Sequence, residues 1–157
     1  MTNINSLFIA TGSNLGNRHQ NLLSAKIELQ RHFKLIAESR IYESPAVDYL
    51  NQPDFYNQVL EFSLPQTKAE SIMSLLLEIE YKMGRDRIIP KGPRLIDLDI
   101  LFYGEQIVNT GTLQIPHPRL FERSFVVLPL SELPGFNLLK EKFDFKIIFD
   151  NHANAIS

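Results

Sequence analysis

Residues 92–102, Gly-Pro-Arg-Leu-Ile-Asp-Leu-Asp-Ile-Leu-Phe, form an apolar, branched run that contains two acids. A short run of this kind that follows Gly and Pro predicts a buried strand. Asp97 and Asp99 stand two residues apart, and side chains at this spacing share one face of a strand, roughly 6 to 7 Å from each other. The stretch therefore predicts a rigid strand that presents two carboxylates in parallel.

Two carboxylates on such a strand need a positive partner, because unpaired charge in a strand built for burial is costly. One candidate partner is a hard divalent cation, or a pair of cations about 3.5–4 Å apart. The alternative is an ion pair with nearby bases, since residues 82–94 carry five bases against the single acid Asp86. An acidic pair beside a basic cluster indicates metal-assisted chemistry on a phosphate.

The rest of the chain alternates the periods of strands and helices. Strands are predicted at residues 6–11, 35–43 and 55–64, with a further short one at 106–108. A helix is predicted from Asn17, as its N-cap, to residue 33.

A second helix is predicted to begin at residues 67–70, Thr-Lys-Ala-Glu, which have the pattern of a capping box. Its apolar stripe comprises Ile72, Leu76, Ile79 and Met83, and Gly84 suits its C-terminus. The resulting order, β-α-β-β-α-β, predicts an α+β fold. We expect a ferredoxin-like antiparallel sheet with helices packed on it, followed by a C-terminal extension.

Composition sets the limits for the class of protein. With 157 residues, 44% hydrophobic and 22% charged, the chain predicts a single globular domain over residues 1–157. A net charge of −2 argues against a surface that binds nucleic acid. The absence of cysteine excludes disulfides and cysteine metal sites. No apolar run reaches about 18 residues, so we expect no membrane partner and a cytoplasmic location. We also expect a monomer.

Several short motifs follow one another along the chain. They are Ala-Thr-Gly-Ser-Asn-Leu-Gly at 10–16, Tyr-Glu-Ser-Pro at 42–45, Gln-Pro-Asp-Phe-Tyr-Asn at 52–57, Gly-Arg-Asp-Arg at 84–87, the Gly-Pro-Arg block at 92–101, Ile-Pro-His-Pro-Arg at 115–119 and Arg-Ser-Phe-Val at 123–126. In this order they resemble the 6-hydroxymethyl-7,8-dihydropterin pyrophosphokinase family, over nearly the whole chain. The resemblance implies transfer of pyrophosphate from ATP to a pterin alcohol in folate biosynthesis, with release of AMP.

The resemblance also implies roles for individual residues. It places two Mg²⁺ ions at Asp97 and Asp99, with ATP as co-substrate. Arg85 and Arg94 could act in catalysis as forked donors to phosphate oxygens, because phosphoryl transfer depends mainly on positioning and electrostatics. The nucleotide contacts that it implies are Leu77, Glu80, Arg85, Arg87, Arg94, Ile100, His117 and Arg123. For the pterin they are Ser44, Pro45, Val47, Phe55, Asn57 and Phe125.

Plainer interpretations stay open for some of these residues. Phe55 and Phe125 suit a hydrophobic core as well as a pterin, and Glu80 suits an exposed helix surface. The loop at residues 88–91 is a residue shorter than the family pattern, and Lys91 stands where an aromatic residue often precedes Gly-Pro-Arg. We therefore assign no stacking role to this loop.

Two functions of other classes also fit parts of the sequence. One is a non-catalytic module of the same fold, which binds a small molecule while the Asp pair is structural. The other is a metal-dependent nuclease or phosphatase, although only one strand with paired acids is evident. Production of AMP from ATP and a pterin alcohol would distinguish these alternatives from the pyrophosphokinase.

Overall fold

The computed structural model describes residues 3–46, 51–84 and 93–157. Its strands are β1 (Ser6–Ser13), β2 (Leu35–Glu38), β3 (Tyr42–Ser44), β4 (Phe55–Ser63), β5 (Asp97–Tyr103), β6 (Val108–Asn109), β7 (Gln114–Ile115) and β8 (Asn154–Ala155). Its helices are α1 (Arg18–Gln30), α2 (Ala69–Lys82), α3 (Ser124–Leu130) and α4 (Phe136–Lys142), with a 3₁₀ turn, η1, at Pro118–Glu122. The fold is α+β, as the sequence predicts.

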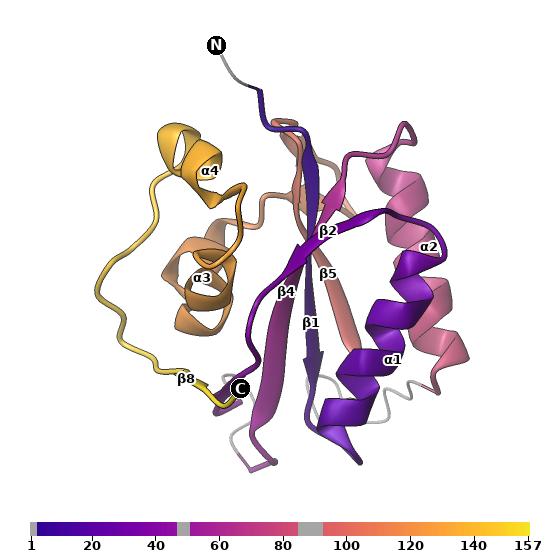
Figure 1. Cartoon of the computed structure of the whole chain (residues 1–157), viewed down its shortest axis with the longest axis vertical. Coiled ribbons are helices and arrows are strands. Elements are labelled where there is room, and N and C mark those ends of the chain that lie inside the picture. The colour runs from indigo at the N-terminus through magenta and orange to yellow at the C-terminus, as the bar shows by residue number, and fades with distance from the viewer. Residues whose placement is uncertain (1–2, 47–50, 85–92) are drawn as a thin grey trace.

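The main sheet is antiparallel in every pairing that the structure describes, with the strand order β5-β1-β4-β3-β8. Strand β2 also pairs with β4, and β6 and β7 form a separate hairpin. Helices α1 and α2 cover one face of the sheet, while α3 and α4 lie on the other (Figure 1). Strand β1 is an inner strand between β5 and β4, and successive residues along it face opposite layers.

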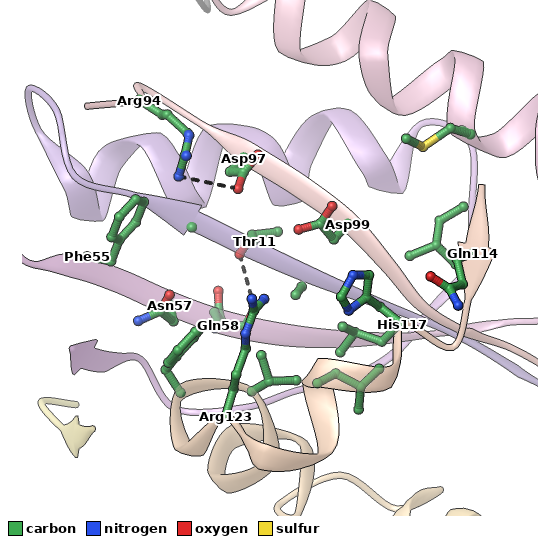
Figure 2. Close-up of a pocket in the computed structure, with 18 of the residues that line it drawn as sticks. Thr11, Phe55, Asn57, Gln58, Arg94, Asp97, Asp99, Gln114, His117 and Arg123 are labelled. Atoms are coloured by element: carbon green, nitrogen blue, oxygen red, sulfur yellow. Dashed lines mark hydrogen bonds and ion pairs between the residues drawn. The ribbon is translucent and has the colours of Figure 1, made fainter. Parts of the chain in front are cut away.

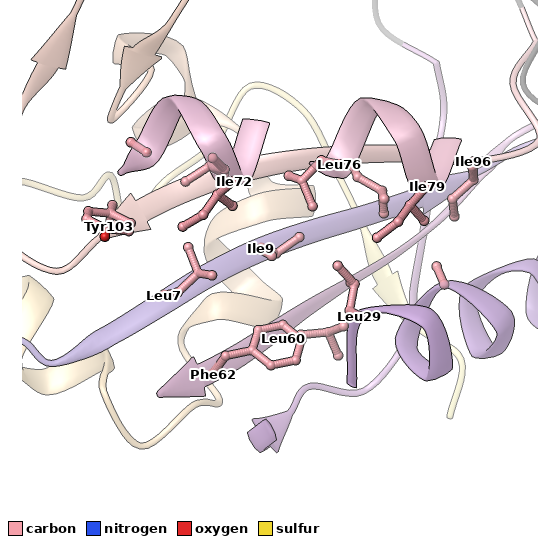
Figure 3. Packing of buried hydrophobic residues seen from close by; sticks show 14 of the residues in the cluster. Leu7, Ile9, Leu29, Leu60, Phe62, Ile72, Leu76, Ile79, Ile96 and Tyr103 are labelled. Atoms are coloured by element: carbon pink, nitrogen blue, oxygen red, sulfur yellow. The ribbon is translucent and has the colours of Figure 1, made fainter. Parts of the chain in front are cut away.

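Two hydrophobic clusters fill the two layers. In the first, Leu7 and Ile9 of β1 face Leu29 of α1 and Ile72 and Leu76 of α2 (Figure 3). In the second, Phe8 of β1 packs with residues of β5, α3 and α4 on the opposite face. Both faces of β1 and β5 are covered along most of their length, so only a few of their residues can line a cavity. Among the described residues, no helix has the length and apolar character to cross a membrane.

Several predicted elements are confirmed with small shifts at their ends. Asn17 caps α1, because its side chain accepts a hydrogen bond of 3.0 Å from the amide of Gln20. The helix ends at Gln30 rather than near Phe33, which packs against the core from the following turn. Gly84, with φ of +90°, follows α2 as predicted.

The single strand predicted at residues 35–43 is wrong, because the structure divides it into β2 and β3. The register against β4 advances by one residue between the pairs Glu38↔Leu60 and Tyr42↔Asn57. Ser39 provides the physical reason: its hydroxyl accepts a hydrogen bond of 3.0 Å from the amide of Val59 in place of a backbone partner. An extra residue on one strand of a pair is a bulge, which interrupts the ladder.

The predicted capping box at residues 67–70 is also wrong. Helix α2 begins at Ala69 with Lys68 as its N-cap, and no side-chain hydrogen bond caps it. The backbone carbonyl of Thr67 instead accepts a hydrogen bond from the Tyr103 hydroxyl, which ties this turn to β5. The short strand expected at 106–108 begins later, as β6.

Candidate active site

A cavity of about 560 Å³ lies on the α3 side of the sheet (Figure 2). Its floor comes from β1, β4 and β5, and its walls come from the segment between β6 and β7, from the segment that leads into α3 and from residues 44–45, with Met73 of α2 at its margin. It brings together residues from 10 to 126, so all but one of the motifs in the sequence contribute to it. The exception, at 84–87, falls mostly on residues 85–87, which lie outside the described chain.

The strand register places residues of β5 and β4 on either side of β1 in the floor of this cavity. Gly12 of β1 pairs with Asp97 of β5 on one side and with Asn57 of β4 on the other. These three residues therefore form one row across the sheet. Since Gly12 has no side chain, the row has a bare centre between a carboxylate and a carboxamide. A Cβ atom at Gly12 would lie 3.6 Å from Asn57 Oδ1, which places the amide oxygen beside this floor.

Asp97 and Asp99 both project from β5 toward the cavity, as the alternation of the strand predicts (Figure 2). The Arg94 guanidinium lies 3.9 Å from Asp97, at the outer limit of an ion pair. In the described chain no group of three or more His, Cys, Asp or Glu side chains could hold a metal. A pair of carboxylates nevertheless suits Mg²⁺, which usually takes one or two carboxylates and completes its shell with water and substrate phosphates. The donor set therefore fits Mg²⁺ bound together with a polyphosphate.

Positive and neutral donors face the carboxylates. Arg123, at the start of α3, points toward Thr11 on the floor of the cavity, and the ring of His117 also faces inward (Figure 2). His117 Nδ1 accepts a hydrogen bond of 3.2 Å from the Arg119 amide. Partial desolvation lowers the pKa of His117 below its usual value, and the nearby charges of Arg123 and Arg119 lower it further. A pKa below the usual 6.5 favours the neutral form of His117 at pH 7, with Nδ1 engaged as an acceptor.

The end of the cavity beside Asn57 has a different character. Phe55 and Phe125 line it from β4 and α3, together with Ser44 and Pro45. Asn57 Nδ2 donates to Ser44 Oγ at 2.8 Å, which fixes the plane of the carboxamide. Two partly exposed rings with a fixed amide are typical of a site for a flat heterocycle.

The predicted site residues thus fall into three groups. Those that line the cavity are Ser44, Pro45, Phe55, Asn57, Arg94, Asp97, Asp99, Ile100, His117, Arg123 and Phe125. Leu77 and Glu80 do not line it: Leu77 is half exposed on α2, and Glu80 is buried against β5. Val47, Arg85 and Arg87 lie outside the described residues, as does the loop at 88–91.

Asn14 does not line the cavity but supports residues that do, and no role was assigned to it from the sequence. It is 1% exposed, and its Oδ1 accepts a hydrogen bond of 2.7 Å from the Arg94 amide. Its Nδ2 donates to Gln52 Oε1 at 2.8 Å and to the Pro53 carbonyl at 3.1 Å. Asn14 thus joins the segment before Phe55 to Arg94. The signals in the sequence were its place in a Gly-Ser-Asn turn directly after a buried strand and its place in the motif at 10–16.

Comparisons with known proteins identify the family to which the chain belongs. The sequence pattern of the family described as 7,8-dihydro-6-hydroxymethylpterin-pyrophosphokinase (HPPK) matches residues 8–135. The 2-amino-4-hydroxy-6-hydroxymethyldihydropteridine pyrophosphokinase of Bacillus subtilis is 38% identical over 131 residues, which cover 82% of this chain and 78% of that protein. The folic acid synthesis protein fol1 of Pneumocystis carinii is 43% identical over 83% of this chain, but the match covers only 18% of its own length.

The chain therefore spans about a fifth of the folic acid synthesis proteins that it matches. Among solved structures, a Plasmodium falciparum HPPK-DHPS triple mutant with pteroate superimposes with a TM-score of 0.62, over 95% of this chain and 42% of that one. At 13% identity this likeness shows the fold alone. The family match covers most of the chain, and on this basis the protein belongs to the 7,8-dihydro-6-hydroxymethylpterin-pyrophosphokinase family.

Proposed function

We propose that this chain transfers pyrophosphate from ATP to the hydroxymethyl group of 6-hydroxymethyl-7,8-dihydropterin, with release of AMP, as a step of folate biosynthesis. The observation that carries the proposal is the row Asp97–Gly12–Asn57. Within one cavity, this row places a carboxylate on one side of Gly12 and a fixed carboxamide on the other, and Gly12 has no side chain between them. This arrangement suits two ligands of opposite character, a polyphosphate and a flat heterocycle, whose reacting atoms meet over Gly12.

On the pterin side, Phe55 and Phe125 would hold the ring by stacking. Asn57 Oδ1 would accept hydrogen bonds from the edge of the ring, since its Nδ2 is already engaged with Ser44 and with the carbonyl of Tyr42. Holding two reactants in line over one floor replaces a collision in solution by a positioned encounter. The depth of the ring in the cavity would then decide how closely the hydroxymethyl group approaches the β-phosphorus.

On the nucleotide side, Arg94 and Arg123 would donate to phosphate oxygens, and neutral His117 would contribute a hydrogen bond without adding charge. Asp97 and Asp99 would hold Mg²⁺, which when bound supplies neutralisation of charge on the phosphates. Arg94 already lies close to Asp97, so one arginine faces both the carboxylates and the ligand that they would bind. Arg85 and Arg87 stay predicted contributors on the grounds of the resemblance.

The element order and the sheet order β5-β1-β4-β3 support the expectation of a ferredoxin-like core in a single domain over residues 1–157. We further expect small molecules rather than nucleic acid as partners. A cytoplasmic monomer remains a prediction that fractionation and sedimentation would test.

The direct test measures AMP released from ATP, by chromatography, with and without 6-hydroxymethyl-7,8-dihydropterin and Mg²⁺. We expect AMP only when all three are present, and Asp97→Ala and Asp99→Ala should each lose most turnover while remaining folded. Loss of charge stabilisation by a metal site should cost several kcal/mol, or on the order of 10³-fold in rate. A pure binding module would bind both ligands without AMP, and a nuclease or phosphatase would not depend on the pterin. Either result would refute the proposal.

A further inference from the structure

Glu80, near the C-terminal end of α2, is a carboxylate in an unexpected place. It is 3% exposed, and its Oε2 accepts a hydrogen bond of 2.7 Å from the backbone amide of Leu98. Helix α2 packs on the other face of the sheet; among its described residues Met73 reaches the cavity past the edge strand β5, whereas Glu80 does not line it. Burial of a charged group is costly unless it is hydrogen-bonded, so this contact has a clear physical role.

The amide of Leu98 needs such a partner because of its position in the sheet. Strand β5 pairs with β1 on one side and lies at the edge of the sheet among the strands that the structure describes. Leu98 itself is only 2% exposed under α2, so water does not readily replace a missing strand. A buried backbone N–H without an acceptor destabilises a fold by roughly 1–3 kcal/mol. Glu80 supplies the acceptor that a neighbouring strand would otherwise provide.

The same hydrogen bond acts on the candidate metal site. The amide of Leu98 belongs to the planar peptide group that links Asp97 to Leu98, and the next residue is Asp99. Fixing this plane at the edge of the sheet limits rotation of the backbone between the two acids. The carboxylates then leave the same face of β5 at a constant spacing, which is what a hard cation requires of its ligands.

We infer that Glu80 is a positioning residue for the carboxylate pair: from the opposite layer it holds the peptide between Asp97 and Asp99 and so sets the geometry in which they bind a divalent cation. The inference rests on the proposed function, and it replaces the direct nucleotide contact expected from the sequence. Partners that orient metal ligands commonly change metal affinity by about 10- to 100-fold when they are removed.

The test compares four proteins: the wild type, Glu80→Ala, Glu80→Gln and Glu78→Ala. Glu80→Gln keeps an oxygen that can accept from Leu98, whereas Glu80→Ala does not. Glu78 is an exposed acid on the same helix and serves as the matched control for loss of charge. Binding of Mn²⁺, as a paramagnetic substitute for Mg²⁺, is measured by electron paramagnetic resonance of the free ion, with and without a non-hydrolysable ATP analogue and against the analogue alone. Amide hydrogen exchange at Leu98 and circular dichroism report on the hydrogen bond and the fold.

We expect Glu80→Ala to bind Mn²⁺ at least about 10-fold more weakly and to exchange the Leu98 amide faster. Glu80→Gln should recover most of both properties, and Glu78→Ala should behave as the wild type. If Glu80→Ala does not fold, Glu80→Met takes its place, because it keeps the bulk of the side chain without an oxygen. Faster exchange with unchanged Mn²⁺ affinity would overturn the inference and leave the proposed function standing. A wild type that binds no Mn²⁺ either alone or beyond the amount bound by the ATP analogue itself would overturn both.

Discussion

Replacing Asn14 by alanine should destabilise the protein and reduce its activity together. The side chain is buried and makes three hydrogen bonds, of 2.7 Å from the Arg94 amide, 2.8 Å to Gln52 and 3.1 Å to the Pro53 carbonyl. Truncation removes all three and leaves the Arg94 amide and the Pro53 carbonyl without this partner. At about 1 kcal/mol for each bond, and more where a buried group stays unsatisfied, we expect a loss of about 2–4 kcal/mol.

For a chain of this length, about 1 kcal/mol corresponds to roughly 2–4 °C in Tm, so the midpoint should fall by about 5–15 °C. Thermal unfolding by circular dichroism measures this shift. The catalytic effect follows from the same bonds, because Asn14 holds Arg94 and the segment before Phe55 in one arrangement. We expect kcat/KM to fall by at least about 10-fold at a temperature where the variant is folded, since small displacements at a reacting centre are costly.

Asn21 provides a matched control in the same part of the chain. Its Nδ2 donates to Ser13 Oγ at 3.1 Å and to the Leu15 carbonyl at 2.9 Å, but it touches neither Arg94 nor the segment before Phe55. Asn21→Ala should therefore lose some stability and keep its catalytic efficiency. The reasoning would be refuted if Asn14→Ala lost less than about 1 kcal/mol, or if both variants lost activity equally.

Three further predictions concern the arginine, the pH dependence and the two ligands. Arg94→Ala should lower kcat by about 10²- to 10³-fold with a smaller change in ATP affinity, because Arg94 stands beside Asp97, where negative charge would develop on the phosphates during transfer. Steady-state kinetics measure both parameters, and a raised KM with unchanged kcat would instead make Arg94 a binding residue. Burial raises the pKa of Glu132, but hydrogen bonds from the Tyr42 hydroxyl and from Arg40 outweigh this and hold the pKa below its usual 4.5. The contribution of Glu132 to the free energy of unfolding is therefore complete above about pH 4.5 and is lost as the pH falls through the lowered pKa. In Glu132→Gln, the free energy of unfolding measured with urea should therefore decrease less steeply at acid pH. An unchanged decrease would contradict this assignment. Calorimetry should show pterin binding tightened about 5- to 30-fold by Mg²⁺ and a non-hydrolysable ATP analogue, since Asn14 joins the segments that carry Arg94 and Phe55, and the same factor should appear in reverse; equal pterin affinity in both states would exclude such coupling.

Local features of the sequence were sufficient for the elements whose formation depends on near neighbours. The run around Asp97 and Asp99 predicts a strand with two carboxylates on one face, and the structure has both lining the cavity. Asn17 caps α1 as its residue type and position predict. The apolar stripe of α2 is buried as expected, although the capping box is not formed. The helix begins one residue later than the capping box requires, with Lys68 as its N-cap, so the Thr67 side chain does not cap it.

The composition of the cavity depended on contacts between residues far apart in the chain. Asn14 finds its partners 38 and 80 residues away, and no pattern near Asn14 indicates them. Glu80 illustrates the same limit, because its position on α2 suggested a surface acid or a nucleotide contact, whereas packing of α2 on the edge strand turned it toward Leu98.

The sequence by itself therefore determined the α+β class, the carboxylate pair and, through its ordered motifs, the family of this protein. Only the tertiary structure decided that Gly12 separates Asp97 from Asn57, that Asn14 joins two segments of the site and that Glu80 supports β5 from the opposite layer. The physical reason is that periodicity and capping act over one or two turns of chain. Strand register and buried hydrogen bonds, in contrast, are settled when distant segments compete for the same partners in the core.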